Sequence, residues 1–271
     1  MELNTVYYKS SKNMSEIDND SVDLIVTSPP YFNIKDYGED DEQVGDIGDY
    51  NRFIESLLEI WIECERVLKP NWKLVINTPL MPMTKSHLNT HYNRHIFDIN
   101  SDIQHSILYR VGWELFLLDT YIWNRVNATK SLMFGSYPYP SNFYAQNTSE
   151  FITIYVKKGK PINDRPKEIK EKSKLTKEEW VAYTKQIRDI PIPNKSDIWF
   201  GKHPAIMPEE IVKRCVKLYS FVWDIVLDPF AGSWTTLKVA KELGRKYIWY
   251  EIIPSYKETI DKKLGKWNLF E

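Results

Sequence analysis

The stretch from Asp224 to Ile252 constrains the fold more than any other. It reads DIVLDPFAGSWTTLKVAKELGRKYIWYEI, which is an apolar run, an acid, a turn of small residues, an amphipathic run ending at Gly244 and a second apolar run. This order predicts strand, turn, helix and strand, the repeating unit of a parallel sheet. Residues 22–27, 50–68 and 73–78 repeat it as strand, amphipathic helix and strand, so the sequence predicts an α/β fold.

A ligand site is predicted where the two C-terminal strands end. Asp228 closes one strand and Glu251 closes the next, 23 positions later. Ligands bind at the carboxyl ends of parallel strands, and an acid at such a spacing holds ribose hydroxyls. The chain has neither a GxGxxG pattern nor a phosphate-binding loop, so a ligand with a ribose and no phosphate is favoured over ATP or NAD. An ordinary tight turn between strand and helix is the alternative.

A second loop, TSPPYFN at 27–33, follows the first predicted strand. Its two prolines fix the backbone. The Ser28 hydroxyl and backbone carbonyls can accept hydrogen bonds from an exocyclic amine, while Tyr31 can stack on the ring that carries the amine. Taken alone, this loop is equally consistent with a plain strand-terminating turn.

Together, TSPPY at 27–31 and DPFAGSWTT at 228–236 resemble the S-adenosylmethionine-dependent amino-methyltransferases of DNA. The catalytic motif comes first and the cofactor motif last, as in the circularly permuted β class. Segments 201–220 and 250–256 resemble the family's segment leading into a helix and its acid-bearing strand end. The resemblance implies a Rossmann-like fold in a single catalytic domain over 1–271, with a mixed seven-stranded sheet flanked by helices.

The resemblance also implies site residues. The catalytic set is Ser28, Pro29, Pro30 and Tyr31, and the S-adenosylmethionine set is Asp228, Pro229, Phe230, Ala231, Gly232, Ser233, Thr235, Glu251, His203 and Pro204. Ser28 and the Pro29 carbonyl would accept hydrogen bonds from the amine of a base flipped out of double-stranded DNA. Methylation at ring carbon 5 needs a cysteine nucleophile, and neither Cys64 nor Cys215 lies in a Pro-Cys loop.

The methylated base is left open. In this family SPPY is associated more with cytosine N4, and an acid at the first position more with adenine N6, so Ser28 favours cytosine. The resemblance further implies restriction–modification with a possible cognate endonuclease, whereas no residue indicates the oligomeric state. A catalytically inactive DNA-binding relative is the alternative of another class.

DNA recognition is expected in the variable regions, approximately 79–149 and 157–200. The net charge of −1 offers no basic surface overall, so any such surface must be local. Candidate DNA contacts are Lys157, Lys158, Lys160, Tyr137 and Tyr139. The chain lacks an apolar run of membrane-spanning length, and its N-terminal residues lack a signal pattern, so a cytoplasmic location without a membrane partner is expected.

One residue conflicts with the family pattern, which has glycine where Trp234 stands. Trp72, Trp223 and Trp249 also stand where glycine is expected. Turn glycines often adopt a positive φ, which a residue with a Cβ adopts only at a cost. Three explanations remain open: a real adaptation, an inactive relative, or UGA codons that some bacteria read as glycine and another code reads as tryptophan.

Overall fold

The computed structural model describes residues 1–32, 47, 49–84, 94–110, 114–128, 136–141, 145–160, 165–193, 206–232 and 234–253. Its main sheet has eight strands in the order β1-β10-β9-β2-β3-β7-β6-β8, rather than the seven implied by the resemblance. In that order the strands are Thr5–Tyr7, Lys246–Tyr250, Ile225–Asp228, Val22–Thr27, Leu68–Pro79, Ser149–Lys157, Leu115–Asn124 and Ile187–Asp189. The first five are parallel, β7 is antiparallel to both of its neighbours, and β8 pairs parallel to β6.

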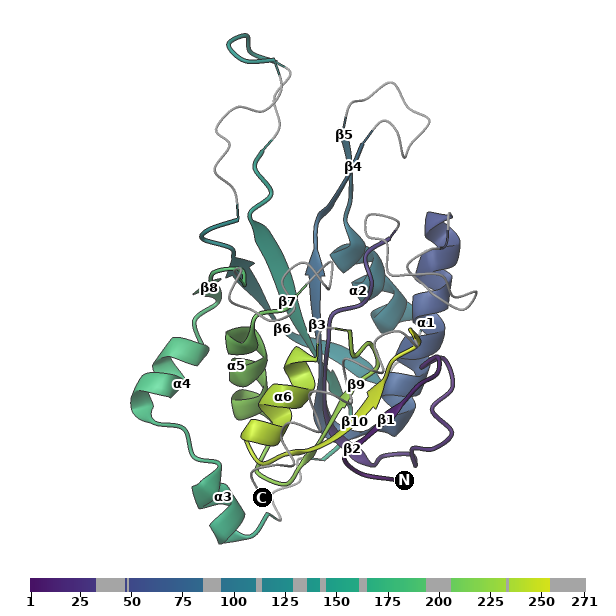
Figure 1. Ribbon diagram of the computed structural model, residues 1–271, viewed down its shortest axis with the longest axis vertical. Coiled ribbons are helices and arrows are strands. Elements are labelled where there is room, and N and C mark those ends of the chain that lie inside the picture. Colours follow the sequence, from purple (N-terminus) through teal and green to yellow (C-terminus); the bar gives the residue numbers. More distant parts are fainter. Residues whose placement is uncertain are drawn as a thin grey trace.

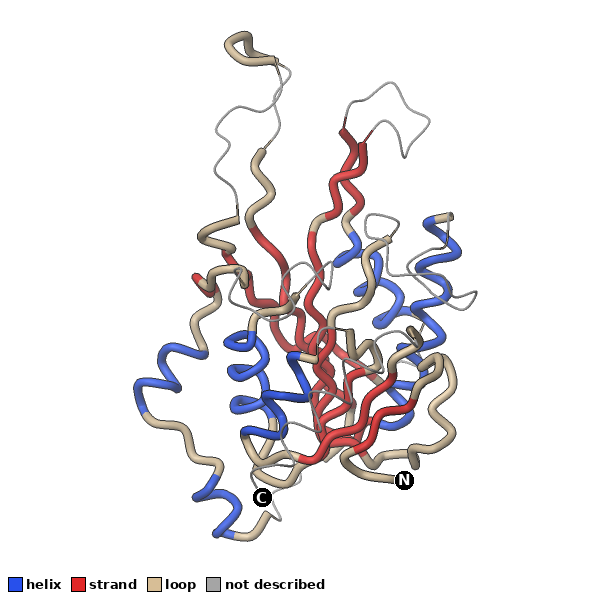
Figure 2. The backbone as a smooth tube through the Cα atoms, viewed as in Figure 1, coloured by secondary structure: helices blue, strands red, loops and turns tan. Residues whose placement is uncertain are grey.

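Helices cover both faces of this sheet, as Figures 1 and 2 show. Helices α1 (Tyr50–Val67) and α2 (Ile99–Tyr109) pack on one face, and α5 (Glu209–Tyr219) and α6 (Thr235–Glu242) pack on the other. The predicted mixed α/β architecture is therefore confirmed. Since β2 and β9 lie between the helix layers, almost all of their side chains are buried.

Helix α1 shows how the local sequence builds these layers. The Asp49 side chain accepts a hydrogen bond from the Arg52 amide at 2.9 Å and caps the first turn. Phe53, Leu57 and Trp61, spaced at helical intervals, are fully buried against the sheet. Burying each such side chain contributes about 1.5–3 kcal/mol, so packing rather than propensity holds the helix.

The middle of the chain, where part of the variable DNA-recognition region is expected, forms regular structure in part. Strands β4 (Met81–Thr84) and β5 (Arg94–Phe97) pair as a hairpin, and α2 follows. This hairpin and the turn at 136–141 extend beyond the sheet at the end where β3 leads into β4 (Figure 1). His95 lies on β5, and His87 and His91 lie outside the described residues.

The charged region after β7 is helical in part. It forms α3 (Lys167–Lys172) and α4 (Lys177–Tyr183) along the outside of the molecule (Figure 1). Arg165 fixes the start of this region, because its Nη2 lies 2.7 Å from Asp23 Oδ1 and 2.6 Å from Asp224 Oδ1. Both carboxylates are buried, so the ion pair joins the helical region to the amino-terminal ends of β2 and β9.

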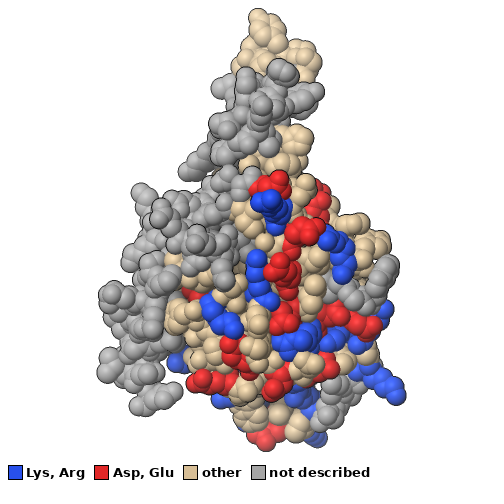
Figure 3. All heavy atoms as spheres, turned by 90° about the vertical axis from the view of Figure 1, so that its right-hand side faces the viewer, with Lys and Arg blue, Asp and Glu red and all other residues tan. Residues whose placement is uncertain are grey.

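Figure 3 shows charge on the side of the molecule that carries α1 and α2. Blue and red side chains alternate there. On α1, Glu63 pairs with Arg66, and Glu55 pairs with Arg110 at the end of α2. The described part of this face therefore presents no single-sign patch for a polyanion. No helix among the described residues is long and apolar enough to cross a membrane.

Candidate active site

The sheet brings the two sequence motifs together. Strand β2, which leads into TSPPY, lies next to β9, which leads into DPFAGS. The Thr27 hydroxyl donates a 2.6 Å hydrogen bond to Asp228 Oδ1, a contact between residues 201 positions apart. Both loops leave the sheet at the carboxyl ends of parallel strands, where ligands bind in open α/β folds.

Asp228 organises the second loop from a buried position. The amide of Phe230 donates to its Oδ1 at 3.0 Å, and the side chain of Thr236 also hydrogen bonds to it. Burial raises the pKa of the Asp228 carboxyl to about 7, although these hydrogen bonds act in the opposite direction. The carboxyl therefore fixes the start of the turn, but its ionised form is buried away from water, which lowers the stability of the folded protein.

Glu251 closes the other side of the same loop. Its Oε2 accepts from the Gly232 amide at 2.8 Å, and its Oε1 accepts from the Ile253 amide at 2.8 Å. Burial raises the pKa of this carboxyl too. Each carboxylate oxygen has further lone pairs that can accept hydrogen bonds from the hydroxyls of a ribose, and Gly232 lets the ligand approach the backbone.

The catalytic loop is anchored just beyond its prolines. Phe32 is buried, with its ring 5.2 Å from that of Tyr50 and 5.4 Å from that of Phe53. Ser28 and Tyr31 are only half-buried, whereas Pro29 is buried. The Tyr31 hydroxyl hydrogen bonds to the Glu150 carboxylate. The loop thus keeps its polar groups partly accessible while aromatic packing holds its end.

Pro30 is half-buried in the first loop, and Pro229, Ala231 and Thr235 are buried where the second loop leads into α6. The other predicted site residues fall into three places. Ser233, His203 and Pro204 lie outside the described residues. Tyr137 and Tyr139 are 72% and 75% exposed on the turn that extends beyond the sheet. Lys157, Lys158 and Lys160 follow the end of antiparallel β7, at the opposite end of the sheet from Ser28 and Asp228. Lys157 is also paired with Asp20 at 2.7 Å, so the fold does not bring these lysines to the site.

The structure adds a polar cluster that motif reading misses. Glu150, Asn77 and Arg125 come from three strands or strand ends and meet beside Tyr31. The only hint in the sequence is that an acid, Glu150, and an amide, Asn77, interrupt apolar strand patterns. That signal cannot be interpreted before the strand register is known.

Two of the four unexpected tryptophans have the backbone of a glycine. The φ angles of Trp223 and Trp234 are +71° and +68°, in the left-handed region that favours glycine. Trp234 is also 2% exposed at the start of α6, packed on Trp249, and neither indole N–H has a partner among the described residues. A buried unpaired donor costs about 1–3 kcal/mol, so residue 234 is unfavourable in two ways.

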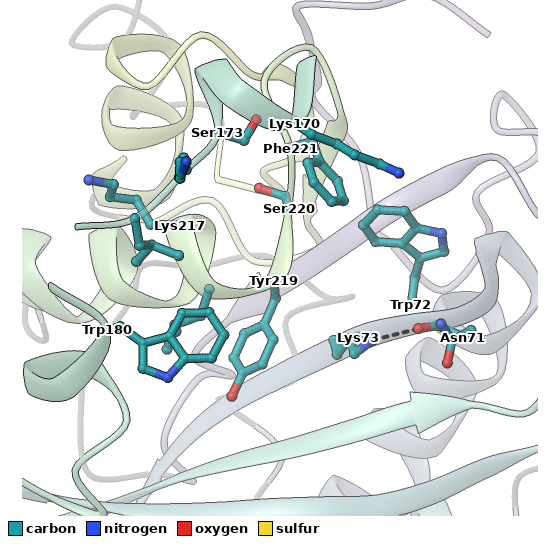
Figure 4. Close-up of a pocket in the computed structure, with 13 residues that line it drawn as sticks. Asn71, Trp72, Lys73, Lys170, Ser173, Trp180, Lys217, Tyr219, Ser220 and Phe221 are labelled. Carbon is teal, nitrogen blue, oxygen red and sulfur yellow. Dashed lines mark hydrogen bonds between the residues drawn. The ribbon is translucent and has the colours of Figure 1, made fainter. Parts of the chain in front are cut away.

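Trp72 differs from these two. It lines a cavity of about 600 Å³ between the first residues of β3 and the end of α3, shown in Figure 4. Its ring packs edge-on against Phe221 and beneath the Arg165 guanidinium, 5.3 Å from the ring centroid. Its neighbour Asn71 takes the positive φ, +67°, which asparagine tolerates. The backbone therefore gives no reason for glycine at position 72.

Comparison with known proteins identifies the family of this chain. A family model described as DNA methylase, named for N6 and N4 methyltransferases, matches residues 22–262. The chain is 31% identical to the type II methyltransferase M.MjaI of Methanocaldococcus jannaschii, over 96% of this chain and 90% of that relative. It is 28% identical to the DNA adenine methyltransferase YhdJ of Escherichia coli, over 90% of this chain and 76% of that relative.

A solved structure shows the same fold. It is a Thermus thermophilus protein described as a DNA modification methylase, in complex with S-adenosyl-L-methionine. The TM-score is 0.76 at 27% identity, covering 97% of this chain and 93% of that one. The present chain belongs to the N6/N4 family of DNA methylases. The enzyme class and the cofactor S-adenosylmethionine implied by the two motifs are thereby confirmed.

The buried Asp228 predicts a pH dependence. An acid whose pKa is raised on folding binds its proton more tightly in the folded state, so its contribution to stability is lost as pH rises from about 4 to about 7. Asp228→Asn should therefore raise the free energy of unfolding of the cofactor-free protein at pH 8, by on the order of 3 kcal/mol. Urea unfolding across this pH range measures the difference. A difference that does not shrink towards pH 4 would contradict the prediction.

The left-handed backbone of Trp223 predicts that glycine is more stable than alanine at this position, the reverse of the order expected in a helix. Trp223 is half-exposed, so Trp223→Gly and Trp223→Ala remove nearly the same contacts, but only alanine keeps a Cβ. The glycine variant should be more stable by about 1 kcal/mol, measured by thermal unfolding. Trp180, on α4 and also exposed, is the matched control, and there alanine should be more stable. Equal stabilities at 223 would show that its backbone does not require glycine.

Proposed function

We propose that this DNA methylase transfers the methyl group of S-adenosylmethionine to the exocyclic amine of a base flipped out of double-stranded DNA, with cytosine N4 favoured. The observation that supports this best is the Thr27–Asp228 hydrogen bond, which holds the catalytic and cofactor loops side by side. Ser28 at the first position of the SPPY motif supports cytosine, as the family pattern implies. Similarity to the DNA adenine methyltransferase YhdJ supports the alternative, adenine N6.

The residues of the catalytic loop account for the chemistry. The lone pair of the exocyclic amine is delocalised into the base, so the amine is a poor nucleophile. Hydrogen bonds accepted by Ser28 and the Pro29 carbonyl would draw the amine towards a tetrahedral geometry and localise that lone pair. When bound, S-adenosylmethionine supplies a methyl group on a sulfonium sulfur. A nitrogen–carbon bond forms as the sulfur–carbon bond breaks, and the nitrogen then loses a proton to water.

The DNA surface is proposed at the end of the sheet that carries this loop. The β4–β5 hairpin and the turn at 136–141 extend there (Figure 1). Exposed Tyr137 and Tyr139 on that turn offer flat apolar surfaces to DNA. Lys157 and its neighbours lie at the other end and carry no part of this proposal. A cognate endonuclease, as in other type II systems, is a further proposal for the genomic setting.

The first experiment tests activity and finds the recognition sequence at the same time. The chain is expressed in a host lacking DNA methylases, and the host DNA is read by single-molecule sequencing. We expect N4-methylcytosine at one short sequence, and Ser28→Ala should lower the rate of methyl transfer about 10- to 100-fold. Ser56→Ala, at a half-buried position on α1, should leave the rate unchanged. N6-methyladenine would support the alternative base, and unmodified DNA would refute methyl transfer by the chain as written.

The second experiment tests the inactive-relative alternative, which the backbone of Trp234 favours. Calorimetry measures the dissociation constant of S-adenosylmethionine for the chain as written, for Trp234→Gly and for Trp234→Ala. We expect the glycine variant to bind most tightly, because relieving a φ of +68° lets the loop relax onto the ligand. Equal micromolar binding by all three would show that the tryptophan is accommodated. Binding by the glycine variant alone would favour an inactive relative or a misread codon, and the codons at 72, 223, 234 and 249 would distinguish these.

A further inference from the structure

A buried carboxylate contacts the tyrosine of the TSPPY motif. Glu150 is the second residue of β7 and is 5% exposed. Its Oε2 accepts from Asn77 Nδ2 at 2.7 Å, its Oε1 accepts from Arg125 Nη1 at 3.2 Å, and the Tyr31 hydroxyl also hydrogen bonds to it. Every partner is a donor, so the carboxylate has the donor set that an ionised acid requires.

Strand topology explains why this acid reaches the catalytic loop. Strand β7 runs antiparallel to β3, with Glu150 opposite Pro79, so β7 begins at the edge where the parallel strands end. Asn77 lies close to the end of β3, and Arg125 directly follows β6. Three strands thus converge on the space beside the loop that follows β2.

The cluster is poorly explained as a stabilising device. A buried charge pair is often no more stable than apolar residues of the same volume. Asn77 turns its amide nitrogen to Glu150, which leaves its own Oδ1 without a partner among the described residues. Burial also raises the pKa of Glu150, so its ionised form is costly. An arrangement with these costs points to a role in the site next to it.

Tyr31 needs such a partner if its ring is to hold a base. The prolines and the buried Phe32 fix the backbone on either side. The plane of a tyrosine ring is set by two further side-chain torsions, so a fixed backbone does not by itself fix the ring plane. A hydrogen bond at the hydroxyl fixes the far end of the ring. Small displacements of a positioning group reduce rates strongly, so a fixed ring plane has a direct consequence for transfer.

We propose that Glu150, oriented by Asn77 and Arg125, is a positioning residue that fixes the ring plane of Tyr31 against which the target base stacks. This inference rests on the proposed function, because it takes the Tyr31 ring to be the stacking surface. Glu150 itself touches neither base nor cofactor in this proposal.

A double-mutant cycle tests whether Glu150 acts through the hydroxyl. Tyr31→Phe removes the hydroxyl and keeps the ring, and Glu150→Gln keeps the shape but replaces one acceptor with a donor. Each change alone should lower kcat about 10-fold, with a smaller effect on the KM for S-adenosylmethionine. In the Tyr31→Phe background, Glu150→Gln should change kcat less than about 2-fold, because the contact is already lost. Tyr183→Phe, which breaks another tyrosine–glutamate contact on α4, should leave kcat unchanged.

A second measurement is independent of activity. The chain is labelled with 3-fluorotyrosine, and its ¹⁹F spectrum, thermal unfolding and circular dichroism are recorded with and without Glu150→Gln. The resonance assigned to Tyr31 by its absence in Tyr31→Phe should shift or broaden, whereas that of Tyr183 should not. An unchanged Tyr31 resonance in a folded variant would overturn the positioning role, as would a kcat loss that is equal in both backgrounds. Absence of methyl transfer by the parent chain would count against the proposed function alone, because the spectrum still decides the Glu150 contact.

Discussion

The active end of this protein depends on the contact between β2 and β9. These strands are far apart in the chain, yet they pair directly, and the Thr27 hydroxyl reaches the Asp228 carboxylate where both strands end. One contact therefore sets the separation of two loops that would otherwise be independent. Asp228 also binds the Phe230 amide, so the residue that joins the strands shapes the cofactor turn as well. The proposed in-line transfer of a methyl group requires such a fixed spacing of the two loops.

The sequence predicts the parts of the site that are local. A strand, a turn and a helix each follow from the residues within them, so both motifs, their strands and helix α1 are all where the patterns place them. The edge strands β1 and β8 are not predicted, because each has only three residues and is defined by its pairing with β10 or β6. The lysines after β7 are candidate DNA contacts on charge alone. Charge carries no information on which end of a sheet a segment occupies, and the antiparallel direction of β7 decides that.

Non-local features of the site cannot be read from the chain. Glu150, Asn77 and Arg125 belong to different strands, and only the register of β3, β6 and β7 brings them together. Backbone conformation is a different case, because the family pattern raises the possibility of glycine at four tryptophan positions. The structure separates these positions: 223 and 234 have a glycine-like φ, whereas 72 and 249 do not. A single explanation for all four tryptophans must therefore account for positions 72 and 249, where the backbone conformation does not require glycine.

Three buried carboxyl groups, Asp228, Glu251 and Glu150, lie at this end of the sheet, and burial raises the pKa of each. None of them stabilises the fold by its charge, because each must ionise away from water. What they share is a set of hydrogen-bond donors whose positions they fix: the Phe230 amide, the Gly232 amide and the Tyr31 hydroxyl. Those donors belong to the two loops for which cofactor binding and catalysis are proposed. The apolar layers around α1 and α5 thus offset the free energy that burying these acids costs. In return, the acids hold the two loops at the edge of the sheet in a fixed geometry.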